Sequence, residues 1–164
     1  MRRSPVVYLA MAIVACGPGA SPKAPVGAGT SAFAGVQARG GVAMGVNQYT
    51  SRHVFEPLPD GGRIALQRDA ADSAGAARIR RHMHEIARRF AAGDFALPGF
   101  VHALAVPGTG IMSARRAAIA YAVDTLPRGA ALRIRSADST AVRAIHEFLA
   151  FQRHDHHAGA RADS

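Results

Sequence analysis

The side chains best suited to chemistry in this sequence are its histidines, eight in a chain of 164 residues. A neutral imidazole is the most common protein ligand for first-row metal ions, and a thioether adds a soft ligand that favours Cu(I). We therefore predict that the chain binds copper or zinc through some of these groups. The candidate ligands are His53, His82, His102, Met112, His146 and His156.

The expected positions of these histidines divide them into two groups. His53 lies on the inward face of a predicted strand, His82 on the flank of an apolar helix stripe, and His102 in the following loop. Three imidazoles with one open position would suit Cu(II) or Zn(II). His146 and His156, on and after a later helix, could form a second, weaker site.

The same histidines also fit a structural role, because no strong metal signature such as H-E-x-x-H is present. His53, His82 and His102 could each be a hydrogen-bonded core histidine. The HDHH run at 154–157 could be a solvated end that binds metal only loosely. A structural or partner-binding protein of the cell envelope, without metal, is therefore the alternative interpretation.

An enzymatic function is the less favoured interpretation. The sequence has no G-x-S-x-G elbow, phosphate-cradling loop or dinucleotide fingerprint. One acid–base pair, His102 with Asp94, stays open as an alternative, because such a pair forms in space rather than in sequence.

The only cysteine is Cys16, so we expect no disulfide and no cysteine-based zinc site. It follows a basic start, Met1 to Arg3, and an apolar run from Val6 to Val14. That run has nine residues. A permanent membrane-spanning helix needs about 20, so the layout is instead typical of a secretory signal.

The residues around the cysteine, Ile13-Val14-Ala15-Cys16, resemble the lipobox of bacterial lipoproteins. The resemblance implies cleavage before Cys16 and a diacylglyceryl thioether on its sulfur, which would hold the protein at a membrane, facing the periplasm. Gly17 stands where an Asp would indicate retention in the inner membrane, so the outer membrane is favoured. An ordinary signal peptide with an incidental cysteine is the alternative.

The chain is basic, with a formal net charge of +9 that would fall to +7 if Arg2 and Arg3 left with the signal. A basic excess often indicates a nucleic-acid partner. An exported, tethered protein rarely meets nucleic acid, so we expect none here. Anionic lipid, lipopolysaccharide or solubility are better explanations of the charge.

Composition divides the chain into four parts. Residues 1–15 are the expected signal peptide. Residues 16–45 are mostly Gly, Ala, Ser, Pro and Val, which cannot offset the entropy of ordering, so they predict a disordered tether. Residues 46–153 suffice for one compact domain, and residues 154–164 predict a His-rich flexible tail.

The domain is predicted to contain two strand–turn–strand–helix units. The expected strands are 50–58, 63–68, 117–125 and 131–135. Pro-Asp-Gly and Pro-Arg-Gly turns join them in pairs, and helices follow over about 71–92 and up to about 153. The match of LPDGG (58–62) with LPRGA (126–130) supports a duplication. We predict an α+β domain, a four-stranded antiparallel sheet with two helices on one face.

The predicted helices show which side should be buried. Ile79, Met83, Ile86 and Phe90 recur at helical spacing, which is typical of a core-facing stripe. Gly93 is expected to end this helix. The predicted core includes Ile79, Phe90, Ile119, Leu132, Ile145 and Leu149.

Several motifs, in order, resemble a family of small, largely uncharacterised exported bacterial proteins. They are MGVNQYT…HVF (44–55), DGGRI (60–64), IRRHM (79–83), F-x-x-GDF (90–95), His102…PG (102–108) and HEFLAFQRHDHH (146–157). The resemblance covers nearly all of the folded part. It departs at Val46-Asn47, where the family has Phe-Asp, and before Pro107, where the family has Met. The histidines of the family pattern fall on His53, His82, His102, His146 and His156.

The resemblance implies no established activity. Some members of this family are catalogued as aspartate carbamoyltransferases. Such an enzyme needs two α/β domains and about twice this length, so that activity is not expected here.

Overall fold

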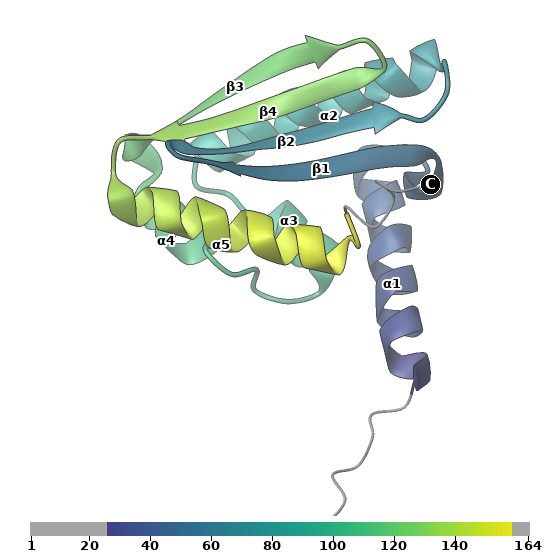
Figure 1. Ribbon diagram of the computed structural model, residues 1–164, viewed down its shortest axis with the longest axis horizontal. Coiled ribbons are helices and arrows are strands. Elements are labelled where there is room, and N and C mark those ends of the chain that lie inside the picture. Colours follow the sequence, from purple (N-terminus) through teal and green to yellow (C-terminus); the bar gives the residue numbers. More distant parts are fainter. Residues whose placement is uncertain (1–25, 159–164) are drawn as a thin grey trace, which may run out of the picture.

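The computed structural model describes residues 26–158, with side chains from residue 32 onward. Its centre is a four-stranded sheet in the order β1-β2-β4-β3, with every neighbouring pair antiparallel (Figure 1). The strands are β1 (Ser51–Leu58), β2 (Gly61–Arg68), β3 (Ile119–Leu126) and β4 (Gly129–Ser136). The predicted α+β class and antiparallel sheet are confirmed, and the strand boundaries differ from prediction by a few residues at most.

Each pair of strands forms a hairpin at the predicted proline-containing turn. Leu58 pairs with Gly61 across the first turn, and Leu126 pairs with Gly129 across the second. The two hairpins meet along β2 and β4, where Ile64 lies opposite Leu132.

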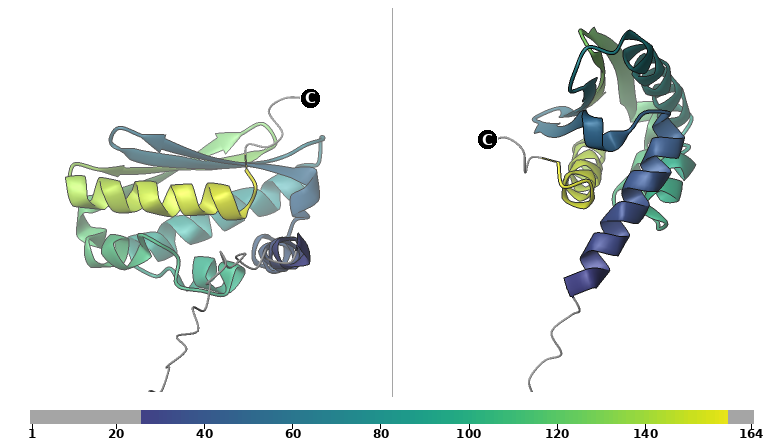
Figure 2. Two further views of the ribbon diagram at one scale, coloured as in Figure 1. Left: turned by 60° about the horizontal axis from the view of Figure 1, so that its bottom comes forward. Right: turned by 90° about the vertical axis from the view of Figure 1, so that its right-hand side faces the viewer.

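Two long helices cover one face of the sheet, α2 (Ser73–Ala91) and α5 (Ser139–Asp155) (Figure 2). Each begins at an aspartate whose carboxylate accepts backbone N–H groups of the first turn, Asp72 for α2 and Asp138 for α5. Gly93 follows the end of α2 at a φ of 80°, a left-handed conformation that glycine adopts without strain.

The two units exchange their helices. Helix α2 follows β2 in the chain but packs mainly against β3 and β4. Helix α5 follows β4 but packs mainly against β1 and β2. Both units therefore share one hydrophobic core.

This core contains all six residues that the sequence predicted for it. Its largest fully buried side chains are Phe90, Phe148, Leu66, Ile79, Met83, Met112, Leu132, Ile134, Ile145 and Leu149. On the other face of the sheet the side chains of Val54 and Glu56 are exposed. Such one-sided burial is usual for an antiparallel sheet.

Smaller elements lie between the two units. Helix α3 (Ala96–His102), helix α4 (Thr109–Ala114) and a single 3₁₀ turn, η2 (Arg116–Ala118), connect α2 to β3. Figure 2 (left) shows α3 and α4 beyond the two long helices, on the side away from the sheet. The sequence predicted this segment as loop, because its helices are too short to carry a periodic stripe.

A further helix, α1 (Val26–Met44), precedes the domain and is followed by a 3₁₀ turn, η1 (Gln48–Thr50). The prediction of a disordered tether over 16–45 is therefore wrong for residues 26–44. Val36 and Met44 are buried, and the Arg39 guanidinium donates a hydrogen bond of 2.7 Å to the carbonyl of Val101 in α3. Residues 16–25, including Cys16, lie outside the described residues, as does the predicted signal peptide.

The C-terminal boundary also differs from the prediction. Helix α5 continues to Asp155, and His156 caps it. The predicted flexible tail is therefore wrong for residues 154–158, while residues 159–164 lie outside the described residues. Within the described part of the chain, no helix combines the length and apolar character needed to cross a bilayer.

Candidate metal centre

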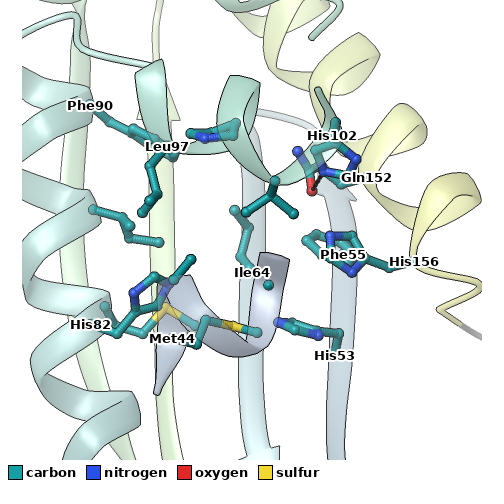
Figure 3. Close-up of a pocket in the computed structure, with 16 residues that line it drawn as sticks. Met44, His53, Phe55, Ile64, His82, Phe90, Leu97, His102, Gln152 and His156 are labelled. Atoms are coloured by element: carbon teal, nitrogen blue, oxygen red, sulfur yellow. Dashed lines mark hydrogen bonds between the residues drawn. The ribbon is translucent and has the colours of Figure 1, made fainter. Parts of the chain in front are cut away.

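A cavity of about 80 Å³ lies where β1, α1, α2, α3 and the end of α5 meet. Most of its wall is apolar, from residues such as Phe55, Ile64 and Val101. The polar side chains in the wall are His53, His82, His102, Gln152 and His156 (Figure 3). The space suffices for an ion or a few water molecules.

His53 reaches the cavity because strand residues alternate between the two faces of a sheet. Its ring stacks on Phe55, two positions further along β1, with ring centroids 5.5 Å apart. This inward orientation was predicted.

His102 is the last residue of α3, and only 6 % of it is exposed. Its Nδ1 forms a short hydrogen bond with the carboxylate of Asp155, and its Nε2 lies 3.0 Å from the side-chain oxygen of Gln152. A carboxylate behind one ring nitrogen is the usual partner of a metal-binding histidine, because it fixes the ring and leaves the other nitrogen for the ion. The predicted alternative partner, Asp94, instead pairs with Arg89 at 3.1 Å.

His156 lies between the other two rings. Its ring centroid is 5.1 Å from that of His53 and 5.0 Å from that of His102. With metal–nitrogen bonds of about 2 Å, two imidazoles on one tetrahedral ion have centroids roughly 5 Å apart. Each of these two neighbouring ring pairs therefore has the spacing of two ligands on one ion.

Burial keeps two of these rings, His53 and His156, neutral. Burial, and to a smaller extent His82, lowers the pKa of His53 to about 4. Burial lowers the pKa of His156 to about 3, with smaller contributions from His53 and His102. A metal ion binds only the neutral form of imidazole, so both rings are in the required state at neutral pH.

One nitrogen in this group lacks a partner. The Nδ1 atom of His156 is buried, and no hydrogen bond within the described structure reaches it. A buried polar nitrogen without a partner costs stability unless a ligand or water satisfies it. This nitrogen could therefore bind an ion without giving up a hydrogen bond within the described structure.

His82 lies on another part of the cavity wall, on the flank of α2, as predicted. It forms a hydrogen bond with the backbone of Ala43 in α1. Burial lowers the pKa of His82 to about 4, against the opposing effects of Glu85 and of this hydrogen bond. The predicted group of His53, His82 and His102 thus differs from the observed cluster, in which His156 takes the place of His82.

Two other predicted ligands are outside the cavity wall. Met112 is fully buried in the hydrophobic core. The Nε2 of His146 lies 2.9 Å from the carbonyl of Leu58, at the first hairpin turn. The predicted second site of His146 with His156 is therefore not formed.

Three residues of the site were missed by sequence reasoning. Met44 lines the cavity from α1, which was predicted as tether. Gln152 and Asp155 support His102, and Gln152 is only 5 % exposed. A signal for Gln152 was present, because it falls four residues after Phe148 on the buried stripe of α5, where a polar residue needs a partner.

As the rings stand, the described residues include no group of three His, Cys, Asp or Glu side chains arranged to hold a metal ion. Binding would require the rings to turn, and His102 would have to exchange Gln152 for the ion.

No protein-family model matches the chain, and neither a curated protein nor a solved structure matches it. The resemblance to small exported bacterial proteins thus stays a prediction. The case for a function rests on the site itself.

Proposed function

We propose that this protein is an exported, lipid-anchored protein of the cell envelope whose domain binds one copper or zinc ion through His53, His102 and His156. The observation that carries the proposal is the contact of three imidazoles from three elements at one cavity. Three nitrogen ligands and one open position suit both Cu(II) and Zn(II).

The surroundings of the three rings support this assignment. Asp155 would hold His102 with Nε2 towards the ion and partly balance the charge of the ion. His156 would use the buried Nδ1 that has no partner. Met44, which lines the same cavity, would replace Met112 as the thioether available to Cu(I).

The first test is metal content. The processed lipoprotein, purified in detergent, is dialysed against Cu(II) or Zn(II), and bound metal is measured by mass spectrometry together with the Tm. We expect one ion per chain and a higher Tm. Both effects should be lost in His53→Ala and His156→Ala.

Matched controls separate this site from a loosely binding terminus. His84 is exposed on α2, so His84→Ala should behave as the unmodified protein, as should removal of residues 159–164. His82→Ala should also retain the ion. Binding that survives in both His53→Ala and His156→Ala, but disappears when His154 and His157 are replaced, would disprove the proposed centre.

A structural role without metal is the second candidate, and the lack of a ready-made ligand group among the described residues favours it. In that case His102 only joins α3 to α5 through Asp155 and Gln152. His102→Ala would then lower the free energy of unfolding equally with and without added metal.

A further inference from the structure

A second pocket, of about 360 Å³, lies on the other side of His53 and His156 and shares these two residues with the inner cavity. We call it the outer pocket. Its wall comes from α1, η1, the first residues of β1, Asp69 just after β2, and the residues just after α5. Its volume is within the range of about 300–1,000 Å³ that is typical of small-molecule sites.

Two glutamines give the outer pocket unsatisfied acceptors. The side-chain oxygens of Gln37 and Gln48 are buried, and neither has a hydrogen-bond partner in the described structure. Gln48 is only 6 % exposed, and its amide nitrogen lies where a Cβ on Gly40 would be, at 1.4 Å, so the glycine makes room for it. A buried carbonyl oxygen is stable only if a donor reaches it, so the two oxygens require N–H groups from a ligand or from water.

The charged and aromatic residues that line the outer pocket indicate which class of ligand it could bind. Arg52 and Asp69 line the same pocket and carry opposite charges. The rings of Phe33 and His157 stack beside it, 4.1 Å apart and nearly parallel. The wall of the pocket therefore contains a cation, a carboxylate, two side-chain oxygens without a donor, and an aromatic pair.

We propose that the outer pocket binds a small zwitterion of the class of free α-amino acids. The ammonium group donates to the oxygens of Gln37 and Gln48 and is attracted by Asp69. The carboxylate binds the guanidinium of Arg52. The side chain of the ligand packs against Phe33 and His157. The site does not depend on a metal ion.

The test uses the processed lipoprotein after chelator treatment, so that the result does not depend on the metal proposal. Each of the twenty L-amino acids is screened as a probe by its effect on the Tm, and the strongest is measured by calorimetry. We expect at least one to bind. Its N-acetyl and carboxamide derivatives should bind about ten- to hundredfold more weakly, because each loses one charged hydrogen-bonding end. No Tm increase from any of the twenty, or equal affinity of the blocked derivatives, would overturn the proposal.

Variants locate the binding to this pocket. Arg52→Ala changes an exposed side chain and should weaken binding by a similar factor, whereas Arg81→Ala, an exposed arginine outside the pocket, should not. Gln48→Met removes an unsatisfied oxygen together with a long hydrogen bond of 3.4 Å to the Gln37 carbonyl. These losses oppose each other, so the Tm of the ligand-free protein should change little while the response to the ligand is abolished. If Gln48→Met lowers that Tm and leaves the affinity unchanged, the glutamine is structural and the proposal fails.

Discussion

Three histidines in the wall of the inner cavity have pKa values far below the ordinary value for the residue. Burial is the largest cause in each case, and it lowers the pKa to about 4 for His53 and His82 and to about 3 for His156. The protonated forms are disfavoured because a charge cannot be solvated there. These rings therefore make the stability of the protein depend on pH.

The first prediction is a loss of stability in mild acid. In the unfolded chain each ring takes up a proton near pH 6.5, whereas in the folded protein His53 and His82 stay neutral until about pH 4 and His156 until about pH 3. The unfolded state thus binds more protons below pH 6.5, and the free energy of unfolding should fall from there towards pH 4. We expect a loss on the order of 1 kcal/mol per ring by pH 5, after allowing for partial exposure. Urea unfolding followed by circular dichroism at several pH values measures it.

Carboxylates act in a different pH window. Hydrogen bonds from the backbone N–H groups of Gly75 and Ala141 hold the pKa of Asp72 and Asp138, respectively, below the usual range. Their contribution to the free energy of unfolding is present above the unfolded pKa of about 3.9 and is lost only as the pH falls through their folded pKa.

Between pH 6.5 and 5 the pH dependence should therefore come from the buried histidines, and His53→Phe should make the free energy of unfolding less dependent on pH in this range. A pH dependence equal to that of the exposed-site variant His84→Phe would contradict the prediction.

At the scale of elements, the exchange of helices depends on close contact between α5 and β2. A Cβ on Gly62 would lie 2.1 Å from Cδ1 of Leu149 and 3.0 Å from the carbonyl oxygen of Glu56. Because Gly62 has no side chain, the side chain of Leu149 can pack directly against the backbone of β2. This contact joins the helix of the second unit to a strand of the first.

Leu149→Ala should lower the free energy of unfolding by about 2–5 kcal/mol, because it leaves a cavity at a fully buried position. Gly62→Ala should cost about 1–3 kcal/mol by overpacking the same contact. In the double variant the new methyl group enters the space left by the leucine. The double variant should therefore be destabilised by less than the sum of the two single-variant losses. Chemical denaturation of the four proteins gives the coupling.

Gly110→Ala is the matched control, because a Cβ there would meet no atom within 4 Å. It should be neutral or stabilise the protein by up to about 1 kcal/mol. Simple additivity of Gly62→Ala and Leu149→Ala would show that the two residues do not share this contact.

At the scale of the whole molecule, the proposed function requires a lipid anchor at Cys16. Processing before this residue would leave ten residues, 16–25, ahead of α1. Fully extended, they span at most about 36 Å. The first residue of α1 would then stay within that distance of the membrane surface.

The corresponding prediction is that the protein labels with palmitate and fractionates with the outer membrane. Cys16→Ala should abolish the label and accumulate the uncleaved precursor, since the peptidase acts after lipid transfer to the thiol. Radiolabelling and membrane fractionation check both effects. Normal processing of Cys16→Ala would mean an ordinary signal peptide and no anchor.

Patterns within short stretches of sequence were enough to predict the local structure of the domain. Proline-containing turns and strand alternation predicted both hairpins, and the spacing of Ile79, Met83 and Phe90 predicted the buried face of α2. The inward position of His53 followed from the same alternation. These features depend on neighbours within a few residues, so a single sequence contains them.

Contacts between segments far apart in the chain could not be predicted in this way. Helix α1 looked like a tether because its Gly- and Ala-rich composition has no apolar stripe, and its stable position depends on contacts with α3 such as that of Arg39 with Val101. His156 was predicted to lie in a flexible tail and to pair with His146, yet the continuation of α5 brings it to His53 and His102. The packing of α2 and α5, each against the hairpin of the other unit, also depends on contacts between distant segments. In each case the deciding energy is burial between segments far apart in the chain, which local propensity and periodicity do not encode.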